Sequence, residues 1–314
     1  MRRILILCMV LLVTGCGFQS PNDLITPAAD PEARYRGLQL ENLGVYQARF
    51  TMSFDGASDW WYQVLLASDG EKKSFDLSIE GLDADRDPGD VRIIEQDGVY
   101  TLQGEATEGA CWQFPAGEDY VVDTLSPDDI LPPDRISSAL ANAGSDTFLG
   151  RSVYHLSLVQ NLEPDFTHAE VDIWREKRSG SVLRYEFQLD GEDPLFNAGK
   201  GTLFGDFSVL ELGSVTVEPL SGCNTDLPLP NDARAVYLLS DLVRYTTNLS
   251  PDQVAEFLLQ ALPQQGWEPA EDSESIPGTA ALSFQRGETA LEVFIQAMDD
   301  GTEVRMFQAS INEP

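Results

Sequence analysis

The feature that most constrains the fold is a long series of segments in which apolar and polar residues alternate. In residues 46–54, Phe50 and Met52 alternate with Arg49 and Thr51. This period of two is typical of an antiparallel strand with one buried and one solvated face. Further candidate strands are residues 60–66, 75–79, 91–95, 99–103, 111–114, 152–159, 169–175, 182–190, 202–209 and 214–217. Short strands separated by turn-forming glycines predict one large antiparallel sheet, curled or nearly closed.

A helical interruption divides these strands into two sets. Residues 125–130 and 134–143 have the pattern of short helical pieces. Ser126 is a plausible N-cap, because Pro127 then occupies the first helical position and Asp129 the third. We expect these pieces to cover the open side of the curled sheet as a lid.

Three short motifs in this region resemble those of a known family. They look like strands of LolA/LppX-like lipoprotein domains, most closely the anchored LprG type. The motifs are residues 150–156 (GRSVYHL), residues 171–185, which begin with VDIW, and residues 204–207 (FGDF). The resemblance covers about residues 37–220, within a domain that we place at residues 37–222. It implies a curved, incomplete antiparallel barrel with a helical lid, enclosing an apolar cavity for acyl chains.

If such a cavity exists, the inward positions of the first strands line it. These candidate ligand-lining residues are Tyr46, Phe50, Met52, Trp60, Tyr62, Leu66, Phe75 and Leu77. A curved apolar wall can hold alkyl chains because burial is driven by area and has no directional requirement. The alternative is that the same side chains form a packed core beneath the lid, which would remove the carrier function.

The N-terminus predicts export and a lipid anchor. Arg2 and Arg3 precede an apolar run of about ten residues, which is shorter than the roughly 20 that span a bilayer and is typical of a secretory signal. The run ends Val-Thr-Gly-Cys, which resembles a bacterial lipobox, so residues 1–15 are interpreted as the signal peptide and Cys16 as the acylated residue. The alternative is an ordinary signal with a chance cysteine. Residues 16–36, rich in Pro and Asp, are interpreted as a flexible tether.

We therefore expect a protein anchored in the cell membrane through acyl chains, facing the outside of the cytoplasm, either the periplasm or the cell surface. The formal net charge of −32 argues against nucleic acid as a partner, because its binding depends on Lys and Arg. With Cys8 in the signal and Cys16 acylated, Cys111 and Cys223 remain and predict one disulfide. Two separate thiols are the alternative.

A smaller second domain follows a Pro-rich linker, residues 223–232. In residues 233–314 we expect strands at 235–239, 242–246, 281–285, 290–297 and 303–308, and one helix beginning after the capping box Ser250–Gln253. Val254 and Leu258 lie on one stripe of that helix. The whole fold is thus predicted to be mainly β, with a small unit of one helix on an antiparallel sheet.

No motif in the chain indicates catalysis. The two histidines, His155 and His168, lie near no nucleophile motif and are interpreted as surface or structural residues. An acidic run containing Asp83, Asp85 and Asp87 is a weak calcium candidate, but it misplaces the glycine and glutamate of the EF-hand loop, so a solvated acidic turn is the alternative. We predict no cofactor and no enzyme activity.

Two functions remain. The first is an anchored lipoprotein that binds or carries a lipid or other apolar ligand in the curved sheet. The alternative is an envelope interaction or sensing scaffold with a packed, ligand-free barrel and a protein partner in the cell envelope. A hydrolase is the weakest interpretation, because a nucleophile–base pair is missing from the motifs.

Overall fold

The protein was analysed as a computed structural model that describes residues 34–81, 90–104, 110–117, 122, 124–162, 164–196, 198–223, 225–237, 243–270, 274–276 and 278–310. The expectations for the signal peptide, for Cys16, for most of the tether and for the acidic run at Asp83, Asp85 and Asp87 lie outside these residues. No helix among the described residues is long and apolar enough to cross a membrane.

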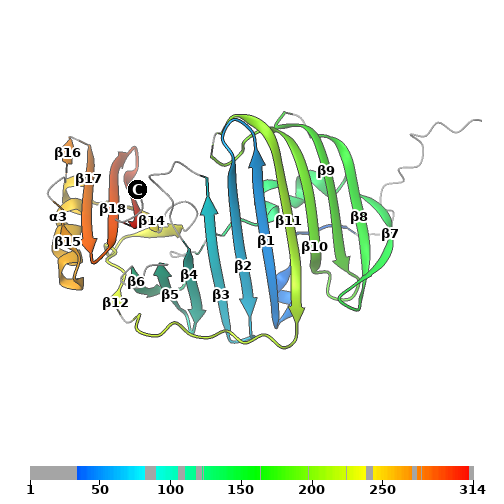
Figure 1. The fold of residues 1–314 in the computed structure, drawn as a ribbon, viewed down its shortest axis with the longest axis horizontal. Coiled ribbons are helices and arrows are strands. Elements are labelled where there is room, and N and C mark those ends of the chain that lie inside the picture. Colours follow the sequence, from blue (N-terminus) through cyan, green and yellow to red (C-terminus); the bar gives the residue numbers. More distant parts are fainter. Residues whose placement is uncertain are drawn as a thin grey trace, which may run out of the picture.

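The predicted mainly-β fold is confirmed: a large curved sheet of 12 strands that does not close is followed by a smaller sheet with a helix (Figure 1). The strand order of the large sheet is β12-β6-β5-β4-β3-β2-β1-β11-β10-β9-β8-β7. Its strands are β1 Tyr46–Asp55, β2 Trp60–Ser68, β3 Lys72–Glu80, β4 Val91–Gln96, β5 Val99–Gly104, β6 Cys111–Pro115, β7 Ala141–Phe148, β8 Arg151–Leu162, β9 Phe166–Glu176, β10 Val182–Glu192, β11 Lys200–Leu212 and β12 Thr225–Asp226.

Neighbouring strands of this sheet are antiparallel, except that the short β12 runs parallel to β6. The two halves of the sheet meet where β1 pairs with β11, at residues such as Phe50 and Phe207. The first half, β1 to β6, lies on one side of this junction and the second half, β7 to β11, on the other.

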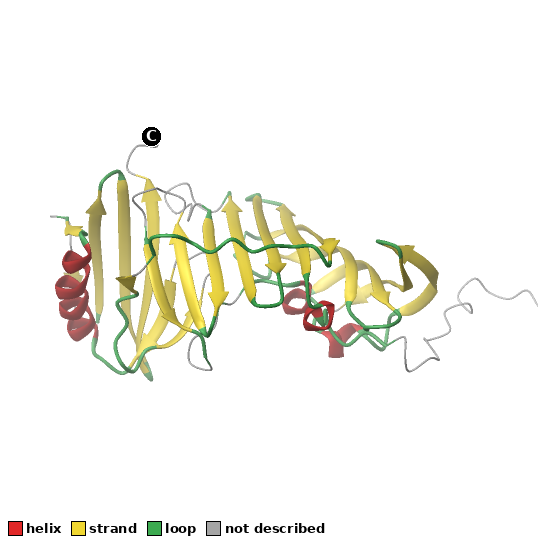
Figure 2. Ribbon diagram, turned by 90° about the horizontal axis from the view of Figure 1, so that it is seen from below, coloured by secondary structure: helices red, strands yellow, loops and turns green. Residues whose placement is uncertain are grey.

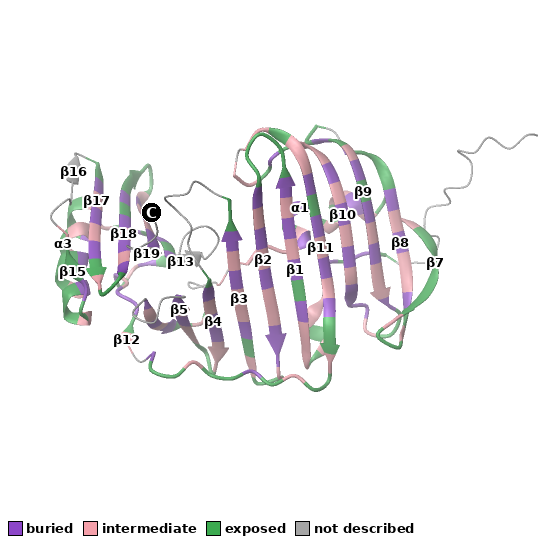
Figure 3. Ribbon diagram, viewed as in Figure 1, coloured by how far each residue is buried: buried purple, intermediate pink, exposed green. Residues whose placement is uncertain are grey.

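The predicted alternation produces one buried face, which we call the inner face. Its central row crosses seven strands in register: Leu77, Val64, Phe50, Phe207, Tyr185, Ile173 and Leu156. Each of these side chains is at most 4% exposed. Figure 3 shows the resulting alternation of buried and less buried residues along β1, β2 and β11.

The lid consists of residues 126–140, which include the single-turn helices α1 (Pro127–Ile130) and α2 (Pro133–Ile136). Ser126 is the N-cap of α1, as predicted, and it forms a capping box with Asp129. Ile130, Leu131 and Ile136 of the lid are buried in the same apolar cluster as the inner face. The β7 end of the sheet curls toward the side on which these helical turns lie (Figure 2).

Two local predictions are wrong. Residues 141–143 are not helical but begin β7, because pairing with β8 outweighs their local helix propensity. Residues 214–217 form no strand, because Val217 is bound by side chains instead: Lys72 Nζ donates to its carbonyl at 3.2 Å and its N–H donates to Asp69 at 3.3 Å.

The smaller sheet has the order β13-β14-β19-β18-β17-β15, with β16 also paired to β17. Its elements are β13 Arg234–Tyr237, β14 Val243–Thr247, α3 Pro251–Ala261, the 3-10 turn η4 Leu262–Gln265, β15 Glu268–Pro269, β16 Glu274–Ile276, β17 Thr279–Arg286, β18 Thr289–Met298 and β19 Gly301–Ser310. The capping box at Ser250 and Gln253 is present, and α3 buries Val254 and Leu258 as predicted. A 3-10 turn, η3 (Leu40–Leu43), precedes the large sheet.

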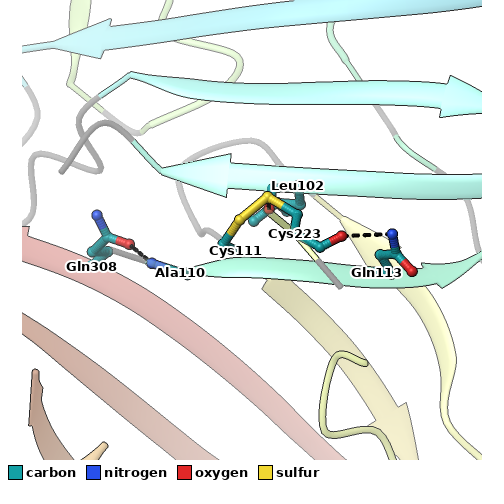
Figure 4. Close-up of a disulfide and its surroundings, with 6 residues drawn as sticks. All are labelled: Leu102, Ala110, Cys111, Gln113, Cys223 and Gln308. Carbon is teal, nitrogen blue, oxygen red and sulfur yellow. Dashed lines mark hydrogen bonds between the residues drawn. A yellow bond between two sulfur atoms is a disulfide. The ribbon is translucent and has the colours of Figure 1, made fainter. Parts of the chain in front are cut away.

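The two sheets are joined by direct contacts beside a disulfide. Cys111 and Cys223 form the predicted bridge, with Cα atoms 4.9 Å apart (Figure 4). Next to it, the Ala110 N–H donates to Gln308 Oε1 of β19 at 2.9 Å (Figure 4). Trp112 Nε1 donates to Gln265 Oε1 at 2.9 Å, and its ring lies 6.5 Å from that of Trp267. The small sheet and the end of the large one therefore share a core.

Candidate functional site

The candidate site is the inner face together with the elements that cover it. The strand register places all eight predicted ligand-lining residues on this face, because Phe50, Met52 and Ala48 of β1 lie opposite Val64, Tyr62 and Leu66 of β2. On the next strand, Phe75, Leu77 and Ile79 lie opposite the same set. Sequence alternation alone was sufficient to assign this face, because a strand has only two.

The inner face is filled rather than hollow at its centre. Phe50 and Tyr62 are 0% exposed and Met52 is 1% exposed. A cavity large enough for water would leave its wall atoms accessible, so no such space borders these three side chains. Trp60 and Leu77 are also buried, whereas Tyr46, Leu66 and Phe75 are half-buried. The expected open hollow is therefore not found at these central positions.

Aromatic side chains account for this filling. The Phe50 ring lies 6.2 Å from that of Tyr62 and 6.4 Å from that of Phe187, and Phe187 lies 6.0 Å from Tyr185. Such tilted and edge-to-face contacts pack the space densely. A ligand on this face would have to displace whatever covers it.

At one end, the inner face is closed by a tight loop around Asp193. The buried carboxylate of Asp193 accepts hydrogen bonds from Trp60 Nε1 at 3.0 Å and from the backbone N–H groups of Leu195 and Ala198. The loop brings Phe196 edge-on to Trp60, with ring centroids 4.9 Å apart. Because this carboxylate binds the backbone of its own loop as well as the indole, it fixes the loop against Trp60, and the loop closes this end of the inner face.

Toward the lid, the cover depends on one carboxylate. Asp128 of α1 accepts a hydrogen bond from the Tyr35 hydroxyl and another from the Leu38 N–H at 3.0 Å. Burial raises the pKa of Asp128 despite these hydrogen bonds, which lower it. Burial also raises the pKa of Tyr35, and so does its proximity to Tyr185 and Asp128. Residues 34–39 and the lid are thus held together by a small, half-buried polar group.

No pattern in the sequence indicates that residues 34–39 belong to the site. They were assigned to the tether and to the start of the barrel, whereas Tyr35 is 2% exposed and Leu38 is 7% exposed. A tyrosine between two arginines in a short non-periodic segment carries no local signal of burial. Asp128 was likewise given no role by the sequence beyond its place in the helical piece at residues 125–130.

The histidines lie on the outer face, away from the lid. His155 Nε2 is 2.7 Å from Asp172 Oδ1, and its ring stacks on Trp174 at 4.7 Å. Arg184 lies over the same indole at 5.0 Å. His168 pairs with Glu170 at 3.0 Å. Within the described part of the chain, no group of three or more His, Cys, Asp and Glu side chains is arranged to hold a metal ion.

Comparison with known proteins adds a description for the small sheet. A family model described as START domain-like matches residues 239–303, which is a minor part of the chain. No curated protein matches the sequence significantly.

Among solved structures, the chain is similar to one in the complex of Pseudomonas aeruginosa MucA and MucB, at 14% identity and a TM-score of 0.28, over 86% of this chain and 90% of that one. It is also similar to an uncharacterised conserved protein of Thermus thermophilus, at 14% identity and a TM-score of 0.26, over 63% and 94% of the two chains. A DUF1329 family protein of Desulfovibrio piger matches at 10% identity and a TM-score of 0.21, over 54% and 87%. Similarity at this level does not by itself indicate a shared function.

Proposed function

We propose that this protein is an exported, lipid-anchored binding protein that holds an apolar ligand between the inner face of its large sheet and the lid. The observation that carries the proposal is the nature of the cover. The central row of the inner face crosses seven strands and lies in one apolar cluster with the cover, which consists of the lid and residues 34–39. Neither part of this cover belongs to the sheet.

Displacing this cover breaks no strand pairing within the sheet. The lid residues Ile130 and Leu131 contact the inner face only through apolar packing, which an alkyl chain reproduces equally well. Among the described residues, the lid is held by the contacts around Asp128 and by Arg135, which donates to Asp165 at 2.8 Å and to the Leu162 carbonyl at 2.7 Å. Residues 34–39 are also held by hydrogen bonds from Val182 and Ser181 to the Leu38 and Gln39 carbonyls. Ligand binding by lid displacement is therefore consistent with a filled interior.

The test is to purify the full-length protein from membranes and analyse its organic extract by mass spectrometry. After delipidation, titration with the neutral apolar dye Nile red should give saturable binding at one site per chain. Arg135→Ala, which removes the lid's ion pair, should increase the rate of dye binding. Arg244→Ala, which removes the pair with Glu303 in the small sheet, is the matched control and should not. An extract without lipid, together with no saturable dye binding to either variant, would overturn the proposal.

The membrane anchor is part of the proposal and has its own test. In bacteria fed an alkyne fatty acid, the wild-type chain should incorporate the label and partition with the membrane, on the outer side of the cytoplasmic membrane. Cys16→Ser should abolish labelling, whereas Cys8→Ser should not, because Cys8 lies within the proposed signal peptide. Equal labelling of wild type and Cys16→Ser would contradict acylation at Cys16.

A second candidate, a tethered envelope scaffold, is favoured by one specific observation. Phe50, Tyr62 and Tyr185 are 0% exposed, as expected of a core that needs no ligand. This function predicts that apolar molecules leave the unfolding temperature unchanged, whereas a ligand that binds the folded protein must raise it by mass action. Thermal unfolding with and without a saturating apolar ligand separates the two.

A further inference from the structure

Residues 34–39, which we call the leading segment, run between the lid and the edge of the inner face. The Val182 N–H donates to the Leu38 carbonyl at 2.9 Å, and Ser181 Oγ donates to the Gln39 carbonyl at 2.9 Å. Tyr35 and Leu38 insert their side chains into the core, while Arg34 and Arg36 remain more accessible. The segment therefore occupies space on the inner face without being part of the sheet.

The segment fits closely against the lid. Gly37 has a φ of +96°, and a Cβ atom on it would lie 2.9 Å from Asp128 Oδ2. A side chain at this position would therefore be strained and would push against the carboxylate. Only glycine allows the chain to pass Asp128 with both Tyr35 and Leu38 bonded to it.

A second polar group under the lid has no partner in this arrangement. The Tyr185 side chain is 0% exposed and its hydroxyl forms no hydrogen bond with the described residues. Its ring meets that of Tyr35 edge-on, with centroids 5.7 Å apart. A buried hydroxyl without a partner is costly, and such groups in native structures often indicate a missing ligand or water.

We propose that the leading segment is an intramolecular plug, and that Asp128 and Tyr185 bind the hydroxyl-bearing polar end of the ligand that displaces it. This inference rests on the proposed function and names the class of ligand. The chemistry of the ligand is inferred from Tyr35, because Tyr35 is an apolar group that ends in a hydroxyl donating to Asp128. A neutral amphiphile, with an alkyl chain and one or more hydroxyl groups, presents the same chemistry and has a further hydroxyl for Tyr185.

The charges around the polar group favour a neutral ligand over an anionic one. The groups that donate to Asp128, the Tyr35 hydroxyl and the Leu38 N–H, are uncharged, and Asp129 is its acidic neighbour on α1. A fatty acid carboxylate placed here would meet the half-buried Asp128 carboxylate at short range, where like charges repel. A hydroxyl group meets only an acceptor.

The plug links ligand binding to the chain that precedes it. When the ligand replaces Tyr35, the Leu38 N–H and the Val182 N–H lose their acceptors. The backbone around the already exposed Arg36 is then free to enter the active site of a protease. Ligand binding thereby releases the leading segment from the inner face.

The experiment uses the delipidated full-length protein and two probes with the same alkyl chain, 1-monooleoylglycerol and oleate, each competing with Nile red at pH 7.5. Hydrogen exchange at Leu38 and Val182 and trypsin cleavage at Arg36 report on the plug. Monooleoylglycerol should bind about tenfold more tightly than oleate, a difference expected from one favourable hydrogen bond set against charge repulsion. It should also accelerate exchange at Leu38.

Gly37→Ala should loosen the plug and increase both Leu38 exchange and monooleoylglycerol affinity by about tenfold. Gly44→Ala is the matched control, because its φ of +72° imposes similar strain but a Cβ there meets nothing within 4 Å. Binding of monooleoylglycerol with Leu38 still protected would overturn the plug and leave the proposed function standing. Equal affinity for oleate would overturn the ligand class. Failure of both probes to bind even Gly37→Ala would overturn the proposed function itself.

Discussion

At the scale of single residues, two buried tyrosines under the lid illustrate how differently one side chain can be accommodated. Tyr35 donates to the Asp128 carboxylate, whereas the Tyr185 hydroxyl has no hydrogen-bond partner among the described residues. Both are at most 2% exposed. The energetic value of a hydroxyl depends on its partner rather than on its burial, so the same substitution should have opposite effects at the two positions.

We expect Tyr35→Phe to lower the free energy of unfolding by about 1.5–3 kcal/mol, the usual range for a hydrogen bond to a charged group. Tyr185→Phe should be neutral or stabilising by up to about 1 kcal/mol, because it removes a buried polar atom without a partner. Urea denaturation of both variants measures the difference. Equal losses would mean that the Tyr185 hydroxyl has a partner after all.

Two carboxylates should respond oppositely to pH. Hydrogen bonds from Thr247 and from the Asn248 N–H lower the pKa of Asp232, whereas burial raises that of Asp128. The contribution of Asp232 is therefore present above the unfolded pKa of about 4 and is lost as pH falls through its lower folded value. For Asp128 the sign is reversed: its contribution is complete below the unfolded pKa and is lost as pH rises through the raised folded value.

Asp232→Asn should accordingly lower the unfolding temperature at neutral pH, because an amide accepts these hydrogen bonds without a charge. The difference from wild type should disappear below about pH 3, where the unmodified carboxyl is itself protonated. Calorimetry across this pH range checks the prediction. A difference that persists undiminished in acid would contradict the assigned linkage.

At the scale of elements, the sequence predicted the pieces that obey a local rule and missed those that depend on distant partners. Alternation located the principal strands and their buried face, the N-cap Ser126 located α1, and the capping box at Ser250 located α3. β7 was mistaken in part for a helix because its conformation is determined by pairing with β8. The burial of Tyr35 depends on Asp128, 93 residues away, and no local pattern records such a contact.

In β11, the glycine at position 205 is explained by a tertiary contact with a neighbouring strand. A Cβ atom on Gly205 would lie 2.1 Å from the ring of Phe187, which is itself buried. Gly205→Ala should therefore lower the free energy of unfolding by about 1–3 kcal/mol through overpacking. Gly117→Ala, where a Cβ meets nothing within 4 Å, should change it by less than about 0.5 kcal/mol. Chemical denaturation compares the two, and similar losses would show that the Phe187 ring yields.

At the scale of the whole molecule, the two sheets form one body through a junction of few residues. Trp112 of β6 packs against Trp267, and Gln308 of β19 bonds to the backbone of Ala110. The disulfide lies directly beside these contacts and closes a loop of 112 residues (Figure 4). Its position explains how a bridge within the large unit can stabilise the attachment of the small one.

Replacing both Cys111 and Cys223 by serine should cost about 2–5 kcal/mol, and the junction should loosen before either sheet melts. Thermal unfolding followed by tryptophan fluorescence should then change from one transition to two, with the first reporting Trp112 and Trp267. A reductant should reproduce the effect in wild type and add nothing to the double variant. A single transition in the reduced protein would show that the tryptophan and glutamine contacts suffice.

The pairing of β1 with β11 has a consequence for biogenesis. Thr51 and Asp206, which lie opposite each other across this pairing, are 155 residues apart in the chain. A nascent polypeptide emerges N-terminus first. One edge of β1 therefore keeps its backbone N–H and C=O groups unpaired with another strand until most of the chain has been released. Unpaired strand edges can pair with other chains and cause aggregation. Pairing between residues far apart in the sequence is also slow. The first half of the large sheet therefore cannot complete its pairing until β11 has been synthesised. The risk of aggregation is highest before β11 pairs with β1.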